Sequence, residues 1–351
     1  MADNTKMRKA AATKNDEFYT CYDTISNEVE HYRDQFKGKV IYCNCDDPTW
    51  SNFWKYFHSN FASLGLKKLI ATHYAKDSQT SYAMIYEGGN DFDMDAGKII
   101  EIASDDNYPA GDFRSKACLK LLNESSIVCT NPPFSLFREY VAQLMEYGKK
   151  FLIIGNQNAI TYKEFFPLLK ENKVWLGYSS NKTMVFRVPD GYRYDEKITA
   201  KMDDGFHYGK VPAISWFTNM DVKYRHDGLW HLNGKFDDTQ AHKYYEGNES
   251  YYPTFDNYPD VINVSKTKDI PIDFTGVMAV PVTWLDKYNP DEFEILEGSN
   301  RYGIFNYWGL NDSIQAAHSH GNNIKGQATY FRIHVKNRNP ISKDKDLGYK
   351  A

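Results

Sequence analysis

The chain has 351 residues, a formal net charge of −4 and an aromatic content of 16%, with 27 Tyr and 21 Phe. This length exceeds the usual size of one domain, so we expect one large domain or two unequal ones. No stretch approaches the roughly 20 apolar residues of a membrane span, and the N-terminus has no apolar signal core, which predicts a cytoplasmic protein without membrane segments.

The first two thirds of the chain alternate apolar strands with amphipathic helices. Residues 15–36 change from an extended start to a helix with Ile25, Val29 and Tyr32 on one face. Further strands are predicted at 39–44, 67–74, 98–104, 125–130 and 149–156, and helices at 46–61 (with Pro48 near its start), 116–124 and 136–148. The pattern extends through 163–172, 173–178 and 213–220. It predicts an α/β fold with a Rossmann-like, doubly wound, mostly parallel sheet covered on both faces.

From residue 223 onward the pattern changes to loops rich in Tyr, Asn, Asp and Pro. Isolated strands such as 275–285 and 329–337 are predicted, and no internal repeat is evident. We therefore expect a second, irregular region at 223–351, poor in regular structure and rich in side chains that can form hydrogen bonds.

Both ends of the chain are basic, whereas the middle is acidic. The basic side chains of residues 1–14 are Lys6, Arg8, Lys9 and Lys14, and those of residues 313–351 are Lys325, Arg332, Lys336, Arg338, Lys343, Lys345 and Lys350. Basic tails on an acidic body fit contacts with phosphate groups, but exposed tails are often only solvated and disordered. The sequence leaves both interpretations open.

The cysteines give no sign of a metal or redox site. They are Cys21, Cys43, Cys45, Cys118 and Cys129, and no pair has C-x-x-C spacing. Cys43 and Cys45 alternate across a predicted strand, so their side chains face opposite sides and cannot jointly hold an ion. We expect free thiols, mostly with packing roles, and no metal site.

Residues 125–140 read as a strand, a proline pair and a helix, and they suit the binding of an amine. Pro132 and Pro133 fix φ and keep the residue before each extended. The Asn131 side-chain oxygen and the Pro132 carbonyl can accept the two hydrogens of an amino group, while Phe134 offers a flat face for a ring. A purely structural role stays open, because Asn-Pro is also a common turn and proline suits the first turn of a helix.

The sequence Asn131-Pro132-Pro133-Phe134 resembles the catalytic tetrapeptide of amino-methyltransferases that use S-adenosylmethionine. The chain also resembles the EcoRI-type adenine-specific DNA methyltransferases over most of residues 14–336. The segments that carry this resemblance are the tetrapeptide, "DEFYT" (16–20), "YCNCDDP" (42–48), "GDFRS" (111–115) and "INVSKTKDIP" (262–271). The resemblance implies a class I methyltransferase fold and methylation of adenine N6 in double-stranded DNA. From the change of pattern at residue 223 and the charge of the ends, we assign a basic flexible tail to 1–14, the S-adenosylmethionine-binding catalytic domain to 15–222 and target recognition, ending in a basic tail, to 223–351.

In open α/β sheets a ligand lies beyond the carboxyl ends of the strands, where four clusters of this sequence should converge. The resemblance gives as candidate cofactor-binding residues Phe18, Tyr19, Thr20, Asn44, Cys45, Asp46, Asp47, Pro48, Thr72, Asp112, Phe113 and Asn131. Asp46 or Asp47 would hold the methionine amino group or the ribose, and Asp112 the adenine amino group beside Phe113. Spaced glycines after the first strand and an acidic residue after the second, both common in methyltransferases, are missing here. The alternative for Asp47, which precedes Pro48, is helix capping.

Asn263, Lys266 and Lys268 supply side chains that read base edges, and Arg332 and Lys336 are further DNA-binding candidates. The lysines could instead contact phosphate only, which gives affinity without sequence choice. By resemblance we expect the site GAATTC, methylated on the inner adenine. We also expect a monomer, with a cognate restriction endonuclease as a genetic but not a physical partner.

The expected mechanism needs no strong base. Asn131 and the Pro132 carbonyl would draw the amino hydrogens out of the ring plane, and stacking on Phe134 would help to offset the cost of flipping the adenine out of the duplex. Two alternatives remain. The same tetrapeptide also serves enzymes that methylate RNA bases or protein glutamine, and the chain could be a catalytically silent DNA-binding module.

Overall fold

The computed structural model describes residues 19–180, 184–188, 199–201, 207–211, 213–227, 236, 252–256, 258–300, 303–305 and 322–340. The chain divides into two units, one made of Met1–Ala159 and Leu176–Asp221 and the other of Ile160–Trp175 and Val222–Ala351. Residues 160–175, which the sequence analysis included in the first domain, therefore group with the second unit. Phe18 and the basic tail at 1–14 lie outside the described residues.

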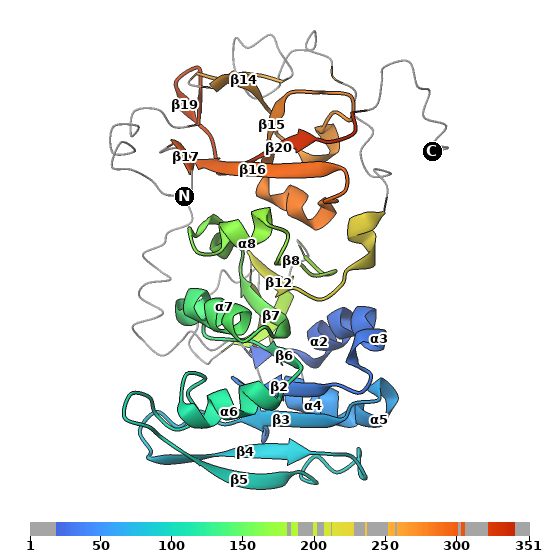
Figure 1. Cartoon of the computed structure of the whole chain (residues 1–351), viewed down its shortest axis with the longest axis vertical. Helices are drawn as coiled ribbons and strands as arrows, with labels where there is room; N and C mark the ends of the chain where they lie inside the picture. Colours follow the sequence, from blue (N-terminus) through green and yellow to red (C-terminus); the bar gives the residue numbers. More distant parts are fainter. Residues whose placement is uncertain are drawn as a thin grey trace. The chain divides into compact units, whose positions relative to one another are not determined.

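An eight-stranded sheet forms the centre of the first unit (Figure 1). Its strands, in spatial order, are β5 (Lys98–Ala103), β4 (Thr80–Tyr86), β3 (Lys68–Thr72), β2 (Val40–Cys43), β6 (Ile127–Thr130), β7 (Lys150–Asn156), β12 (Ile214–Thr218) and β8 (Trp175–Leu176). Every residue of β2 and β6 is buried, because apolar strands at the centre of such a sheet are covered on both faces. Edge strand β5 is mostly exposed.

The sheet is mixed, so the predicted mostly parallel arrangement is not confirmed. Strands β3, β2, β6 and β7 are parallel to one another. On one side, β4 and β5 pair antiparallel, and on the other β12 runs antiparallel to β7. Short connections explain the antiparallel pairing of β4 and β5, since β3, β4 and β5 follow one another without an intervening helix, and a parallel crossover needs a dozen or more residues.

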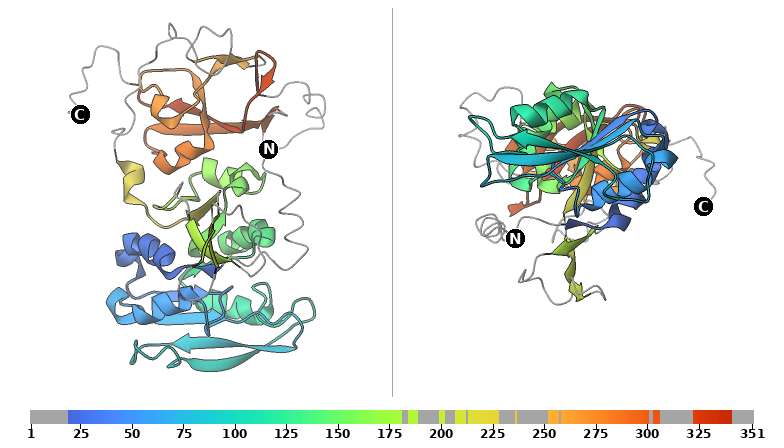
Figure 2. Two further views of the ribbon diagram at one scale, coloured as in Figure 1. Left: turned by 180° about the vertical axis from the view of Figure 1, so that it is seen from behind. Right: turned by 90° about the horizontal axis from the view of Figure 1, so that it is seen from below.

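Helices cover both faces of this sheet, as predicted for an α/β fold. They are α2 (Tyr22–Val29), η1 (Glu30–Tyr32), α3 (Arg33–Phe36), α4 (Asn52–Ser59), α5 (Phe61–Leu64), α6 (Lys116–Glu124), η2 (Phe134–Leu136) and α7 (Phe137–Glu146). Figure 2 shows the blue helices α2 to α5 and the green helices α6 and α7 on opposite faces of the sheet. The predicted apolar stripe is confirmed, since Ile25, Val29 and Tyr32 are all buried.

Helix α4 begins later than the sequence suggested. Pro48 lies in the loop before it, and Ser51 is the N-cap, whose side-chain oxygen accepts a hydrogen bond from the Phe53 amide at 3.0 Å. Serine is a strong N-cap because it satisfies an amide that has no partner within the helix. Beside the main sheet, the first unit has a four-stranded sheet of β1 (Tyr19–Thr20), β9 (Met184–Val188), β11 (His207–Val211) and β10 (Thr199–Lys201).

The second unit contains a six-stranded sheet, so the prediction of an irregular region is wrong for its described part. Its strands, in spatial order, are β13 (Thr254–Phe255), β14 (Tyr258–Asn263), β15 (Val277–Pro281), β20 (Arg332–Asn337), β16 (Phe293–Asn300) and β17 (Gly303–Phe305). Further elements of this unit are α8 (Phe166–Lys170), η4 (Lys223–His226), η5 (Thr267–Asp269), η6 (Val282–Lys287) and the hairpin of β18 (Asn323–Ile324) and β19 (Gln327–Ala328). The central strand β20 pairs with β15 and β16, which lie far from it in the sequence. Local periodicity does not report such distant pairing.

Among the described residues, no helix combines the length and the apolar character that a bilayer crossing requires.

Candidate active site

A pocket of about 1540 Å³ lies in the first unit, beyond the carboxyl ends of β2, β3 and β6. Its walls also include β1, the start of α4, the loop before α6 and strand β9. The chain runs from β2 outward to β3 on one side and from β6 outward to β7 on the other, so the strand order reverses between β2 and β6. Ligands of open α/β sheets bind at such a reversal. The volume also exceeds the roughly 300–1,000 Å³ of an ordinary small-molecule pocket, which leaves room for two ligands.

Most of the predicted site residues line this one pocket. They are Tyr19, Thr20, Asn44, Cys45, Asp46, Asp47, Asp112, Phe113, Asn131, Pro132 and Pro133. Pro48, Thr72 and Phe134 do not line it. Thr72 is buried behind the pocket wall, where its hydroxyl donates to the Asn44 carbonyl at 3.2 Å. Phe134 is the first residue of η2 and is half-buried.

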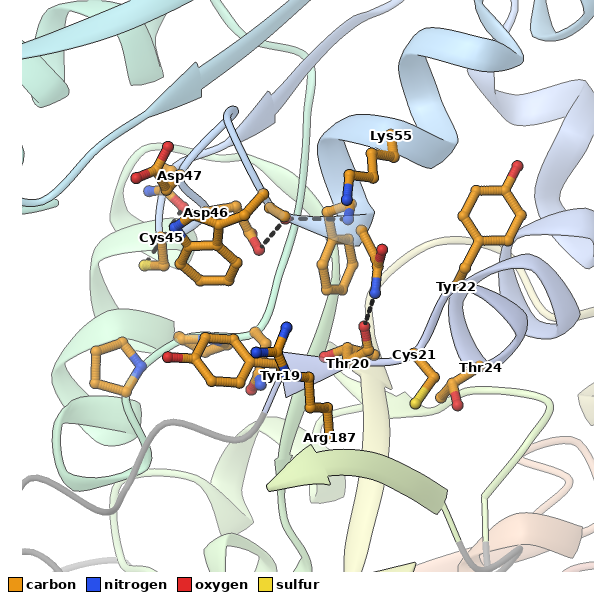
Figure 3. A pocket seen from close by; sticks show the side chains of 18 of the residues that line it. Tyr19, Thr20, Cys21, Tyr22, Thr24, Cys45, Asp46, Asp47, Lys55 and Arg187 are labelled. Atoms are coloured by element: carbon orange, nitrogen blue, oxygen red, sulfur yellow. Dashed lines mark hydrogen bonds between the residues drawn. The ribbon is translucent and has the colours of Figure 1, made fainter. Parts of the chain in front are cut away.

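Asp46 lies buried where the ends of β2 and β6 meet (Figure 3). Its Oδ1 accepts a hydrogen bond from Ser51 Oγ at 2.7 Å, and its Oδ2 accepts one from Thr130 Oγ1. The Asn131 backbone amide is a third donor to this carboxylate. Burial raises the pKa of Asp46 to about 6, although the hydrogen bonds from Thr130 and Ser51 oppose the shift.

Asp47 belongs to a separate network. Its Oδ1 accepts from the backbone amide and the hydroxyl of Thr49 at 2.9 and 2.7 Å and from Tyr82 Oη at 2.9 Å, while its Oδ2 lies 2.8 Å from His73 Nδ1. Burial tends to raise the pKa of Asp47, but the bonds from Thr49 and Tyr82 and the nearby His73 outweigh it and lower the pKa. Asp47 therefore ties the loop after β2 to the end of β3 and to β4.

Asp112 is held by a neighbouring arginine. Arg114 donates to both of its oxygens, from Nε at 2.9 Å and from Nη2 at 2.8 Å, and the guanidinium also lies 5.1 Å from the centre of the Phe113 ring. Phe113 packs edge-on against Tyr140, with ring centres 5.0 Å apart. The pair predicted for a cofactor adenine thus lies in the pocket wall with its orientation set by Arg114 and Tyr140.

Thr20 Oγ1 and Asn44 Nδ2, in the pocket wall, have no hydrogen-bond partner within the described part of the chain. Both side chains are nearly fully buried, with 6% and 2% of their surface exposed. The other end of the Asn44 amide is occupied, since Tyr140 Oη donates to its Oδ1. A buried polar group without a partner costs free energy, so both atoms favour a polar ligand in this pocket.

Several residues of the pocket were not predicted from the sequence. Trp50 is 46% exposed and meets Tyr19 edge-on, with ring centres 4.8 Å apart. The guanidinium of Arg187 lies over the Tyr19 ring, 5.5 Å from its centre. Figure 3 shows Arg187 against Tyr19. Only the pairing of β1 with β9 brings Tyr19 beside Arg187, so no local signal could have linked them.

Gly111 allows the loop before α6 to reach the pocket. Its φ is +81°, and a Cβ atom at this position would lie 1.9 Å from the His73 carbonyl oxygen. No other residue fits such an approach without movement of the backbone. The glycine in "GDFRS" was visible in the sequence, but its contact with the end of β3 was not.

The DNA-binding candidates of the second unit divide into two groups. Lys266, Lys268 and Lys336 are exposed. Asn263 and Arg332 are buried, and Arg332 Nε donates to Asn263 Oδ1 at 2.9 Å. The buried pair joins β14 to β20 across the intervening strand β15, and of these five candidates only the three lysines present their side chains at the surface.

Comparisons with known proteins show the family of the chain. The family model for the adenine-specific methyltransferase EcoRI matches residues 6–338. The chain is 44% identical to the type II methyltransferase M.EcoRI of Escherichia coli over 349 residues, which cover 96% of this chain and 98% of that protein. It is 39% identical to the type II methyltransferase M.MpnI of Mycoplasma pneumoniae, with coverage of 95% and 98%. No solved structure is significantly similar. This chain therefore belongs to the EcoRI family of adenine-specific methyltransferases.

Proposed function

We propose that the chain is a site-specific DNA methyltransferase that transfers a methyl group from S-adenosylmethionine to adenine N6. The observation that carries the proposal is the convergence of Asn131, Pro132 and Pro133 with the candidate cofactor residues on one pocket at the strand reversal. The volume of about 1540 Å³ suits a cofactor and a flipped base together.

The donor set of the pocket fits S-adenosylmethionine. Thr20 Oγ1 and Asn44 Nδ2 are buried atoms suited to the polar groups of its methionine and ribose parts, and Phe113 is an apolar surface beside Asp112 for its adenine. When bound, this cofactor supplies a methyl group activated by the positive charge on sulfur. Phe18, outside the described residues, stays a predicted member of the set.

The amine-binding role belongs to Asn131 and Pro132. The Asn131 side-chain oxygen and the Pro132 carbonyl would accept the two hydrogens of the target amino group and hold the nitrogen lone pair out of conjugation with the ring. Because both acceptors belong to a stiff proline segment, little reorganisation is needed at the moment of reaction. The proton is lost to water afterwards, so no strong base is required.

A duplex hides adenine N6 from such a pocket, so the base must be flipped out, at a cost of a few kcal/mol. Stacking on Phe134 would offset about 1–3 kcal/mol of that cost. Phe134 is half-buried at the start of η2 rather than in the pocket wall, so this role requires its ring to face the base when DNA is bound.

The second unit would read the target sequence, with exposed Lys266, Lys268 and Lys336 contacting DNA. By similarity to M.EcoRI we propose GAATTC as the site, with methylation of the inner adenine by a monomer. A cognate restriction endonuclease would be a genetic partner, and the cytoplasm is the expected compartment.

The test is a plasmid carried by a host that expresses this chain. Protection of the plasmid from the EcoRI nuclease, together with methyladenine at the inner position of GAATTC by methylation-sensitive sequencing, is the expected result. Cleavage with methyladenine at other sites would show a different target sequence. Absence of methyladenine from DNA, with methylation found on RNA or protein glutamine, would contradict the proposal, and absence of cofactor binding would favour a silent DNA-binding module.

A further inference from the structure

Asp46 links three elements of the first unit through its buried carboxylate. Ser51, which donates to it at 2.7 Å, is also the N-cap of α4. Thr130 is the last residue of β6, and Asn131 follows it. The carboxylate thus joins the loop after β2 and the start of α4 to the point where the chain leaves β6 and enters the Asn131–Phe134 segment.

A second contact holds the far end of the same segment. Tyr140, in helix α7, donates its hydroxyl to Asn44 Oδ1. Asn44 and Asp46 belong to one loop and their side chains are 2% and 6% exposed. This loop therefore fixes the chain on both sides of the tetrapeptide, just before it through Thr130 and after it through Tyr140.

The contacts of Asp46 suit an ionised carboxylate. All three groups that reach it, the Ser51 and Thr130 hydroxyls and the Asn131 amide, are donors, and an ionised carboxylate is an acceptor only. Hydrogen bonds to a charged group are about twice as strong as neutral ones. The neighbouring Asp47 has no part in this network, because its oxygens are bound by Thr49, Tyr82 and His73.

We propose that Asp46 is a positioning residue for methyl transfer, which sets the place of Asn131 through Thr130 and the Asn131 amide, instead of binding the cofactor. The proposal rests on the role of Asn131 in the proposed function. It assigns a different task to each of the two adjacent carboxylates, since Asp46 orients the amine-binding segment and Asp47 supports the loop next to β3 and β4.

Thr130→Val is the decisive variant, because Thr130 is fully buried, does not line the pocket and donates its hydroxyl to Asp46. Valine keeps its shape and removes the hydroxyl. We expect the single-turnover rate constant of methyl transfer to fall about 10- to 100-fold, with cofactor affinity changed less than about twofold. Thr130→Ser, which keeps the hydroxyl, should retain the rate within about threefold.

Thr218→Val is the matched control. Thr218 is also fully buried, and its hydroxyl donates to the Phe151 carbonyl at 2.6 Å, but it lies on β12, beside the start of β7 and away from the carboxyl ends that form the pocket. The same chemical change there should lower stability without lowering the rate constant of methyl transfer.

A double variant separates positioning from general damage. In an Asn131→Ala background, Thr130→Val should change the residual rate less than about twofold, because residues that act as a unit are not additive. Hydrogen exchange of the peptide around residues 129–137 should be faster in Thr130→Val than in wild type, whether or not the chain methylates DNA. Failure of the wild type to methylate DNA would refute the proposed function. The exchange measurement would then still test whether Asp46 holds the Asn131 segment in place.

Three results would overturn the proposal. They are an unchanged methyl-transfer rate in Thr130→Val, a loss of rate matched by an equal loss of cofactor affinity, and unchanged hydrogen exchange at 129–137. The second of these would place Asp46 among the cofactor ligands.

Discussion

At the residue scale, the side-chain amide of Asn131 is the group nearest to the proposed chemistry. One preorganised acceptor aimed at a reacting group is worth about 10²- to 10³-fold in rate. We predict that Asn131→Ala loses at least this factor in methyl transfer while the affinity for S-adenosylmethionine, measured by calorimetry, changes little. Equal activity of the variant and the wild type would remove Asn131 from the mechanism.

Asp46 should give methyl transfer a pH dependence. Burial raises its pKa in the folded chain from the ordinary value of 3.8 to about 6. Because the three groups around it are all donors, the segment is held by the ionised form, so the rate should rise with pH through about 6. The pH profile of the single-turnover rate constant checks this, and Asp46→Asn should lower the rate and remove the rise.

The same group should act on stability in the opposite direction. A folded pKa above the unfolded one means that the stabilising contribution is fully present below pH 3.8 and is lost as the pH rises through about 6. Stability from Asp46 therefore falls over the range in which catalysis appears. Such opposition is common where a site holds a buried charge for function.

At the scale of elements, Gly111 decides whether the loop before α6 can approach β3. We predict that Gly111→Ala lowers the free energy of unfolding by more than about 2 kcal/mol and weakens cofactor binding, because a methyl group would overlap the His73 carbonyl. Urea denaturation and cofactor titration measure the two effects.

Gly148→Ala separates backbone strain from this overlap. Gly148 has a φ of +60°, but a Cβ there would meet no atom within 4 Å. The variant should therefore show only the roughly 1–2 kcal/mol cost of a left-handed conformation, with normal cofactor binding. If both variants behaved alike, the close approach at Gly111 would be of no importance.

At the scale of the whole molecule, positive charge near the N-terminus should affect DNA binding. Each phosphate contact contributes about 0.9 to the slope of log affinity against log salt concentration. We predict that removal of residues 1–14 weakens binding and flattens this slope, as measured by fluorescence anisotropy over a salt series. Replacing Lys6, Arg8, Lys9 and Lys14 by Gln, at constant length, should have the same effect, and an unchanged slope would make the tail a solvated segment.

Much of the first unit follows from local pattern. The apolar strands 39–44 and 125–130 and the helices between them correspond to β2, β6, α4 and α6, because burial on both faces leaves a continuous apolar run that is visible without a structure. The convergence of Asn44, Asp46, Asp112 and Asn131 on one pocket also followed from the rule that strand ends meet at one edge of the sheet.

What the sequence by itself determined was therefore the order of the elements, the tetrapeptide proposed to bind the amine and the edge of the sheet at which it lies. Tertiary structure decided which side chains meet there. Asp46 bonds to Thr130, 84 residues away, Tyr19 lies beside Arg187 through strand pairing, and Asn263 and Arg332 are buried against each other. The physical reason is that local periodicity indicates whether a residue is buried. Contacts between residues distant in sequence depend instead on how the strands pair and pack in the folded chain.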